Sequence, residues 1–412
     1  MKSNILRHIL LSNSSQALQF GSRWVLTIFL LKFLSIENFA LFSFVYSLSN
    51  ILLSVFPFGS STYLILNKYT NLRDKQYAIS SAFNIIFLLF IISCLAFLVL
   101  SPVLGHIKSW NYLPYGIVLS LILSLNLVFF SFYKGLGDFI TELRAYIVFA
   151  LGIFTMLCLM YFYKVDDIRF VFIMLISLNV IVFLITLYKS LARKVITLRS
   201  LFIKPTHLRH LFKERKYFGL QEMTIAAHTQ LAMLLLYYIV DEKTYGYYRA
   251  LFVIIAPAFM ITVAVSQVVL NKLKELVGSS RYQFFRKTQL YLLLLGLLIS
   301  SLLLVFKSFL FNYFELPNNE FVELSYYGVI VILLMRYVFS NYEMLLVVGG
   351  KQNIRFWIMF FSAIVSTVLI FILPKHFGLI GAVSVNITSY TIVLIGCLYT
   401  SEMFEIKKIK FS

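Results

Sequence analysis

The stretch YYIVDEKTYGYYRALFVIIAPAFM, Tyr237–Met260, decides the fold that we predict for this chain. An apolar run ends at Val240, three charged residues follow, and Gly246 lies among tyrosines before a second apolar run. Tyrosines gather where a membrane meets water, and charged residues mark the point where a chain leaves the bilayer. The pattern predicts a tight hairpin between two membrane-spanning helices, with its bend at Gly246.

The composition of the whole chain is that of a membrane protein. Its 412 residues are 60% hydrophobic and 13% charged, whereas soluble domains are about 45–50% apolar and about 25% charged. Long apolar runs recur, and about 20 residues suffice for a helix to cross a bilayer. Strands of a membrane barrel would be about 9–11 residues long with alternating polarity. We therefore expect an all-α membrane protein.

The apolar runs predict about twelve transmembrane helices in two halves. We expect a six-helix bundle over 1–190, a basic linker over 191–216 and a second six-helix bundle over 217–412. Two weak repeats support this division. LILNKY after the second helix matches VVLNKL after the eighth, and KGLGDF after the fourth matches GGKQN after the tenth. Paired bundles of this kind enclose a central cavity in transporters.

Basic residues give the expected orientation. The net charge is +19, and most of the 36 Lys and Arg residues lie in alternate loops, which is the pattern of cytoplasmic loops. Both termini are therefore expected on the cytoplasmic side. The linker is predicted to be an amphipathic helix on the anionic membrane surface, or else only a topology signal. No basic run has the aromatic interleaving of a strand-binding groove, so no nucleic-acid partner is expected.

Ionisable residues inside the predicted spans are the candidates for function: Arg23, Glu222, His228, Arg249, Arg336 and Glu343. Each costs roughly 2.5–3.5 kcal/mol at bilayer depth and often marks a pathway. The three arginines are predicted to line the cavity and bind an anionic head group, because guanidinium grips phosphate in bidentate fashion. The two glutamates are candidates for ion coupling or charge balance, and His228 is expected to pack. The alternative is interhelical ion pairs or snorkelling side chains.

No catalytic residue, metal site or cofactor is predicted. Three cysteines stand alone in apolar runs and are expected to pack, and three helical asparagines are expected to bond neighbouring helices. These residues are Cys94, Cys158, Cys397, Asn84, Asn126 and Asn386. GGK at 349–351 lacks the other residues of a P-loop. The chain is not expected to be an enzyme.

Several stretches resemble the multidrug/oligosaccharidyl-lipid/polysaccharide (MOP) exporter superfamily. TYGYYRALFVIIAP resembles its G-x-Y-x-x-A signature, and FALFSFVYSLSNILLSVFPFGSSTYLI resembles its second helix. LLVVGGKQNIRFWIMFF with PKHFGLIGAVSVNITSY resembles the region of helices 10 to 12. Within the superfamily, the size and the basic loops look like a Wzx-type flippase of O antigen or a related polysaccharide.

That resemblance implies transport of an undecaprenyl-diphosphate-linked oligosaccharide across the bacterial inner membrane by alternating access. Membrane lipids, a polysaccharide polymerase and chain-length proteins are the partners that it implies. The nearest alternative is an ion-coupled multidrug antiporter, which would want an acid in the first helix, where this chain has Arg23. The lipid II flippase branch typically has fourteen spans. A polymerase or ligase would need a sizeable external domain, and the predicted external loops are short.

Overall fold

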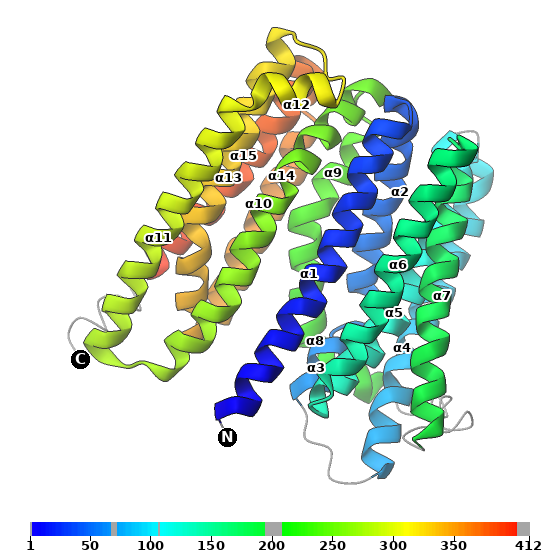
Figure 1. The fold of residues 1–412 in the computed structure, drawn as a ribbon, viewed down its shortest axis with the longest axis vertical. Helices are drawn as coiled ribbons and strands as arrows, with labels where there is room; N and C mark the ends of the chain where they lie inside the picture. The colour runs from blue at the N-terminus through cyan, green and yellow to red at the C-terminus, as the bar shows by residue number, and fades with distance from the viewer. Residues whose placement is uncertain (1, 67–71, 106–107, 194–207, 402–412) are drawn as a thin grey trace. The chain divides into compact units, whose positions relative to one another are not determined.

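The computed structural model describes residues 2–66, 72–105, 108–193 and 208–401 (Figure 1). Those residues form helices and turns, with no strand among them. Ten of the helices in these ranges are long and apolar enough to cross a membrane. The prediction of an all-α, multi-pass membrane protein is therefore confirmed.

Contacts divide the chain into two compact units. Unit 1 comprises Met1–Phe29 and Leu41–Ala226, and unit 2 comprises Leu30–Ala40 and Ala227–Ser412. The helices of unit 1 are α1 (Lys2–Phe33, which runs on into unit 2), α2 (Ile36–Val55, which begins in unit 2), α3 (Ser60–Leu66), α4 (Leu72–Leu104), η1 (Lys108–Tyr112), α5 (Leu113–Gly135), α6 (Phe139–Tyr163), α7 (Ile168–Ala192) and α8 (Leu208–Ala226).

Unit 2 holds the rest of the chain. Its helices are η4 (Ala227–Leu231, a π-turn), α9 (Ala232–Leu236), α10 (Glu242–Glu275), α11 (Gly278–Val305), α12 (Lys307–Tyr313), α13 (Glu320–Val348), α14 (Gln352–Ile370) and α15 (Leu373–Ser401). Residues 194–207 of the predicted linker lie outside the described residues. The domain boundaries at 190 and 217 stay a prediction, although contacts group α8 with unit 1.

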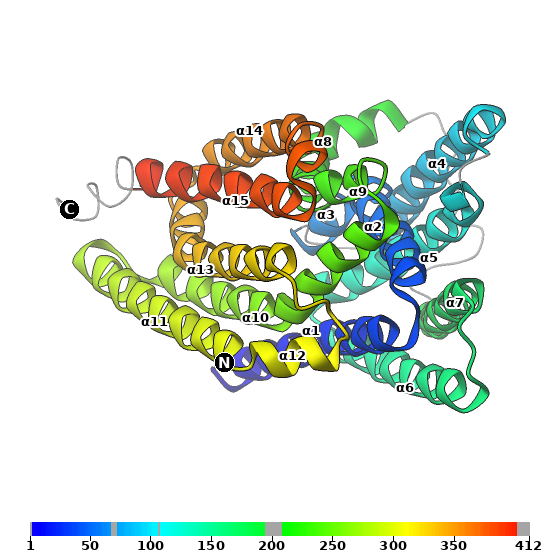
Figure 2. The same ribbon diagram turned by 90° about the horizontal axis from the view of Figure 1, so that it is seen from above.

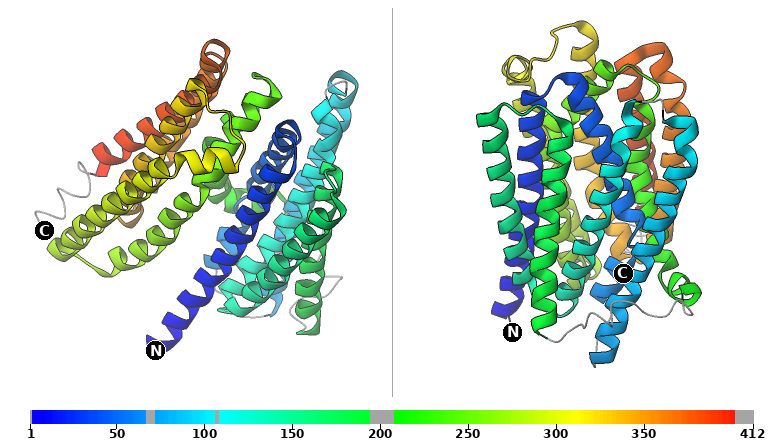
Figure 3. Two further views of the ribbon diagram at one scale, coloured as in Figure 1. Left: turned by 45° about the horizontal axis from the view of Figure 1, so that its top comes forward. Right: turned by 90° about the vertical axis from the view of Figure 1, so that its right-hand side faces the viewer.

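Each unit is built around one helix. In unit 1, α5 packs against α3, α4, α6 and α7, and α6 runs beside α7 (Figures 1 and 3). In unit 2, α13 packs against α10, α11, α14 and α15, as the view from above also shows (Figure 2). α5 is the fourth predicted span and α13 is the tenth. The two central helices thus hold matching places in the predicted repeat.

Local sequence explains where the helices begin. Asp138, Asp167, Asp241 and Asn319 are N-caps, whose side chains accept a backbone N–H from the first turn of α6, α7, α10 and α13. Such caps replace hydrogen bonds that a helix start lacks. Because α10 begins at Glu242, the bend of the hairpin lies at 237–241, before the predicted position.

The predicted bend at Gly246 is wrong. Gly246 is helical, and a Cβ there would lie 2.6 Å from Ile36 Cγ1 and 2.7 Å from the Ile36 carbonyl. The glycine is needed for close packing between two segments of unit 2 rather than for a turn. Pro57 and Gly59 predict a break in the second span. The break is confirmed, since α2 ends at Val55 and Gly59 has φ of +72°.

Two of the twelve predicted spans are not among the ten helices that are long and apolar enough to cross a membrane. The first corresponds to α1, and the seventh to the interrupted run of α8, η4 and α9. α1 begins at Lys2 rather than near residue 17, and α8 begins at Leu208 rather than 217. Both runs carry polar and charged residues, so their hydropathy understates their helical length.

Two of the three asparagines expected to bond neighbouring helices do so. Asn126 donates to the Asn179 carbonyl across α5 and α7, at 3.0 Å. Asn386 donates to the Tyr248 hydroxyl across α15 and α10, at 2.7 Å. The cysteines are free thiols, and Cys397 is fully buried. Over the described ranges no cluster of His, Cys, Asp or Glu could hold a metal ion.

Candidate functional site

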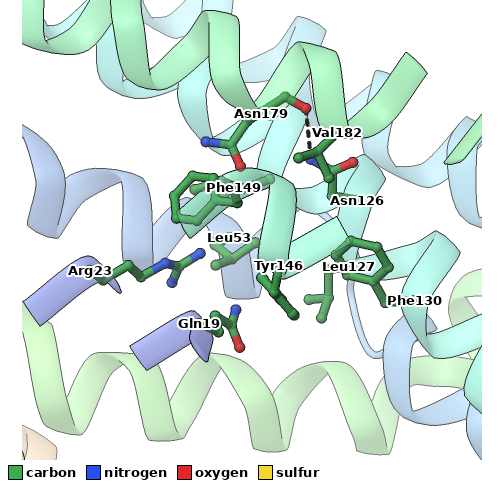
Figure 4. A pocket seen from close by; sticks show the side chains of 11 residues that line it. Gln19, Arg23, Leu53, Asn126, Leu127, Phe130, Tyr146, Phe149, Asn179 and Val182 are labelled. Carbon is green, nitrogen blue, oxygen red and sulfur yellow. Dashed lines mark hydrogen bonds between the residues drawn. The ribbon is translucent and has the colours of Figure 1, made fainter. Parts of the chain in front are cut away.

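Arg23 lines a small cavity inside unit 1. It lies in α1 with Gln19 one turn before it, and both side chains reach toward α5, α6 and α7 (Figure 4). The cavity also meets the amides of Asn126 and Asn179 and the ring of Tyr146. Arg23 makes no ion pair with any residue of the described ranges. A guanidinium in this position therefore has hydrogen-bond donors to offer.

The size of this cavity limits what it can hold. Its volume is about 30 Å³, enough for roughly one or two water molecules. A diphosphate does not fit in such a space. In this conformation, water in the cavity can hydrate the guanidinium of Arg23. A lipid head group would need a larger cavity.

Glu222 lies in unit 1 against the start of α3. Its Oε1 accepts hydrogen bonds from the hydroxyls of Ser61 and Thr62, at 2.9 and 2.8 Å. These residues form the first turn of α3, where a carboxylate also interacts favourably with the helix dipole. Glu222 is thus held by hydroxyl groups and a helix terminus, and no cation of the described ranges pairs with it.

Arg215 is a buried charge that the sequence analysis placed in the basic linker. Its side chain is fully buried, with Nη1 donating to Ser60 Oγ at 2.6 Å and the guanidinium 4.6 Å from the centre of the Tyr63 ring. Nη2 donates to Ser81 of α4. Arg215 therefore joins α8 to α3 and α4 and is not one of the exposed charges expected of a linker on the membrane surface.

A charged cluster lies inside unit 2. The carboxylate of Glu343 is nearly buried, and Arg355 contacts its Oε1 through Nε at 2.7 Å and Nη2 at 2.6 Å. Arg336 lies 3.6 Å from the other oxygen, with its guanidinium 5.0 Å from the centre of the Phe339 ring. The predicted shared face of Arg336 and Glu343 on α13 is confirmed by this contact.

The basic stretch GGKQNIR, 349–355, predicts a turn between two spans. The turn ends earlier, and Arg355 lies in the first turn of α14, where it forms the closer of the two ion pairs. The cluster holds two guanidinium groups and one carboxylate. Its surplus positive charge is carried by Arg336, which is the more exposed arginine of the two.

The two remaining candidates of unit 2 are Arg249 and His228, and neither forms an ion pair with Glu343 in the described ranges. Arg249 of α10 contacts the sulfur of Met233 on α9, and its Nε is buried without a hydrogen-bond partner in the described ranges. His228 lies in the π-turn, with Nδ1 3.3 Å from the hydroxyls of Ser362 and Ser389. His228 is hydrogen-bonded, as expected of a packing histidine.

Solved structures of membrane transporters share the architecture of the chain. The lipid II flippase MurJ in an inward closed conformation is 15% identical, with 97% of this chain and 89% of that chain covered and a TM-score of 0.72. The fold is that of the MOP superfamily transporters. An inward-facing multidrug resistance MATE family transporter of the superfamily is 14% identical, with 97% and 95% covered and a TM-score of 0.69.

The third structure with the MOP fold is a transporter from Pyrococcus furiosus, whose reverse polarity of the binding pocket suggests a different function. It is 15% identical, with 98% of this chain and 95% of that chain covered and a TM-score of 0.65. No protein-family model and no curated protein matches the sequence. At these identities the likeness establishes the MOP fold and not a substrate.

Proposed function

We propose that this protein is a flippase that moves an undecaprenyl-diphosphate-linked oligosaccharide across the bacterial inner membrane. Arg23 carries the proposal, because its guanidinium lines a cavity and has no carboxylate partner in the described ranges. An uncompensated cation within a span is costly. That cost is offset when an anion binds to it, and a diphosphate suits the fork of a guanidinium.

The arginines of unit 2 support the same reading. Arg336 shares Glu343 with the closer Arg355, so its own charge is only partly balanced. Arg249 keeps a buried N–H without an acceptor in the described ranges. Under the proposal, Arg23, Arg249 and Arg336 bind the phosphates as the substrate passes. Glu343 balances the arginines while no substrate is bound.

The comparisons favour a transporter that works by alternating access, since the MOP fold includes a lipid II flippase. A repeat unit of O antigen or a related surface polysaccharide is the proposed cargo. The proposed location is the bacterial inner membrane with both termini in the cytoplasm, close to a polysaccharide polymerase and chain-length proteins. Neither an enzymatic step nor a cofactor is part of the proposal.

A second candidate function is ion-coupled export of small molecules. Glu222 favours it, because a carboxylate held by the Ser61 and Thr62 hydroxyls and the start of α3 can bind a proton or a cation without breaking an ion pair. MATE transporters share the fold. Against this candidate, the cavity of unit 1 is lined by Arg23 and not by an acid.

The experiment that tests the proposal is complementation of a strain that lacks the gene. Arg23→Ala and Arg336→Ala are expected to reduce surface polysaccharide at unchanged protein abundance, whereas Arg169→Ala, an exposed arginine at the start of α7, is expected to have no effect. Arg→Lys at either site is expected to restore part of the output, because an ammonium keeps the charge and loses the fork.

Two outcomes would overturn the proposal. Full polysaccharide output from both alanine variants would remove any role for a cationic cavity. Unchanged polysaccharide on deletion of the gene, together with increased sensitivity to cationic drugs that Glu222→Gln fails to relieve, would favour the antiporter instead.

A further inference from the structure

A second cavity lies in unit 2, where the ends of three helices meet. Its volume is about 480 Å³, within the usual range of about 300–1,000 Å³ for small-molecule sites. It lies among the first turns of α10, the start of α13 and the beginning of α15. We call it the terminal cavity. None of the arginines or glutamates proposed for transport lines it.

Aromatic rings from all three elements line the terminal cavity. Tyr247 comes from α10, Phe321 from α13 and Phe377 from α15. Phe321 and Phe377 are 65% and 61% exposed, so most of each ring is free of packing within the unit. An exposed ring beside a cavity offers a flat apolar surface to a ligand, and the C–H face of a sugar ring is a suitable partner for it.

Polar groups lie between these rings. The Tyr247 hydroxyl and the His376 imidazole have no hydrogen-bond partner in the part of the chain that the structure describes. Asn319 uses Oδ1 to cap α13, which leaves its N–H₂ group to donate. The Gly378 backbone turns through φ of +54°, and nothing lies within 4 Å of where its Cβ would be. The lining therefore offers both donors and acceptors.

The charges around the terminal cavity argue against an ionic ligand. The helix starts beside it carry four acids, and three lysines only partly balance them: Asp241, Glu242, Glu320 and Glu323 against Lys243, Lys375 and Lys307, which pairs with Glu323. An acidic surround disfavours phosphate. No carboxylate belongs to the lining itself, so a metal ion or an organic cation would have no counter-charge there.

We infer that the terminal cavity binds a neutral sugar ring through its aromatic faces and hydrogen-bonding groups. The cavity lies at the helix ends that the charge pattern assigns to the side opposite the basic loops. Its role in transport rests on the proposed function: it would receive the oligosaccharide part of the substrate on the side of release. Sugar binding itself does not depend on that role.

The test uses the purified full-length chain in lipid nanodiscs with methyl glycosides of neutral hexoses and of N-acetylhexosamines as probes. Saturation-transfer NMR is expected to show binding with a dissociation constant on the order of 1 mM. Phe377→Ala is expected to weaken binding about tenfold, because a stacking face is lost. Phe371→Ala is the matched control, since it removes an exposed ring near the end of α14 that does not line the cavity.

Two results would overturn the inference: no saturation transfer to any probe, or equal transfer in the wild type, Phe377→Ala and Phe321→Ala. Displacement of the sugar by pyrophosphate would likewise overturn the assignment of a neutral ligand. The proposed function fails separately. If Arg23→Ala and Arg336→Ala both support full polysaccharide output while the sugars still bind at Phe377, the flippase proposal is wrong and the sugar site remains.

Discussion

The two arginines that share Glu343 are expected to respond differently to mutation. Arg355 contacts Glu343 Oε1 at 2.6 and 2.7 Å, within the range of charge-assisted hydrogen bonds. Arg336 lies 3.6 Å from Oε2, beyond hydrogen-bonding distance. The side chain of Glu343 is only 3% exposed. Arg355 therefore holds the buried carboxylate, and Arg336 adds mainly a nearby charge.

These contacts give the magnitudes. Breaking a buried ion pair costs about 3–5 kcal/mol, because it leaves an uncompensated charge. Arg336 still compensates part of that charge after Arg355→Ala, so we expect a loss of about 3 kcal/mol. A loss of 1 kcal/mol lowers the melting temperature of a folding unit of 150–250 residues by about 2–4 °C, so the melting temperature should fall by roughly 6–12 °C. Arg336→Ala removes a partly buried charge and its contact with Phe339, which together are worth about 1 kcal/mol.

The assay is the melting temperature of the purified variants, followed by fluorescence-detected size-exclusion chromatography. Arg336→Ala is expected to melt within about 4 °C of the wild type while losing transport. The double variant Arg355→Met with Glu343→Leu should recover most of the loss of Arg355→Ala, because apolar groups can replace a buried ion pair at little cost. Equal melting temperatures for Arg336→Ala and Arg355→Ala would refute the reasoning.

Two further predictions concern local structure in unit 1. Gly59→Ala is expected to destabilise the protein by at least about 2 kcal/mol more than Gly137→Ala. Both glycines have positive φ, but only at Gly59 would a Cβ strike backbone, 2.5 Å from Gly219 N, and equal melting temperatures would contradict this. At Asp138, burial raises the pKa, but hydrogen bonds from Thr141, Lys189 and Arg193 outweigh it and lower the pKa overall. The stability that the charge contributes is present above the unfolded pKa of about 4 and is lost as the pH falls through the folded pKa. Asp138→Asn should therefore melt about 2–4 °C below the wild type at pH 7, and this difference should disappear in acid. A difference in melting temperature that stays constant with pH would exclude this linkage.

Hydropathy and charge were sufficient to predict the fold. Apolar runs gave most of the helices, and the Pro57–Gly59 break was found because proline and glycine interrupt a helix in a recognisable order. Glycine alone was ambiguous. Gly246 next to charges looked like a bend, whereas it is a close-packing residue against Ile36. One sequence cannot distinguish these two uses, because both exploit the missing Cβ.

The candidate site was predicted less completely. Arg336 and Glu343 could be paired because they lie seven residues apart on one helix, a spacing that puts both on one face. Arg355 could not be paired with them, because it lies on another helix. The sequence spacing of residues on α13 and α14 does not reveal how closely the two helices pack. A basic residue just after a Gly-Gly turn looks like a topology signal. Tertiary packing turned it into the principal partner of a buried carboxylate.

Arg215 shows how a membrane helix can be missed when its buried face is polar. Leu211, Arg215, Phe218 and Glu222 recur at intervals of four, three and four residues, so they lie on one face of α8. Leu211 and Arg215 are both buried, and Arg215 and Glu222 reach the same first turn of α3. The charges before residue 217 led us to assign the first part of α8 to the linker, whereas the period of the whole segment is that of a packed helix. Hydroxyls of α3 bond Glu222, and hydroxyls of α3 and α4 together bond Arg215. The period is therefore the more reliable guide where serines and threonines lie on the partner helices.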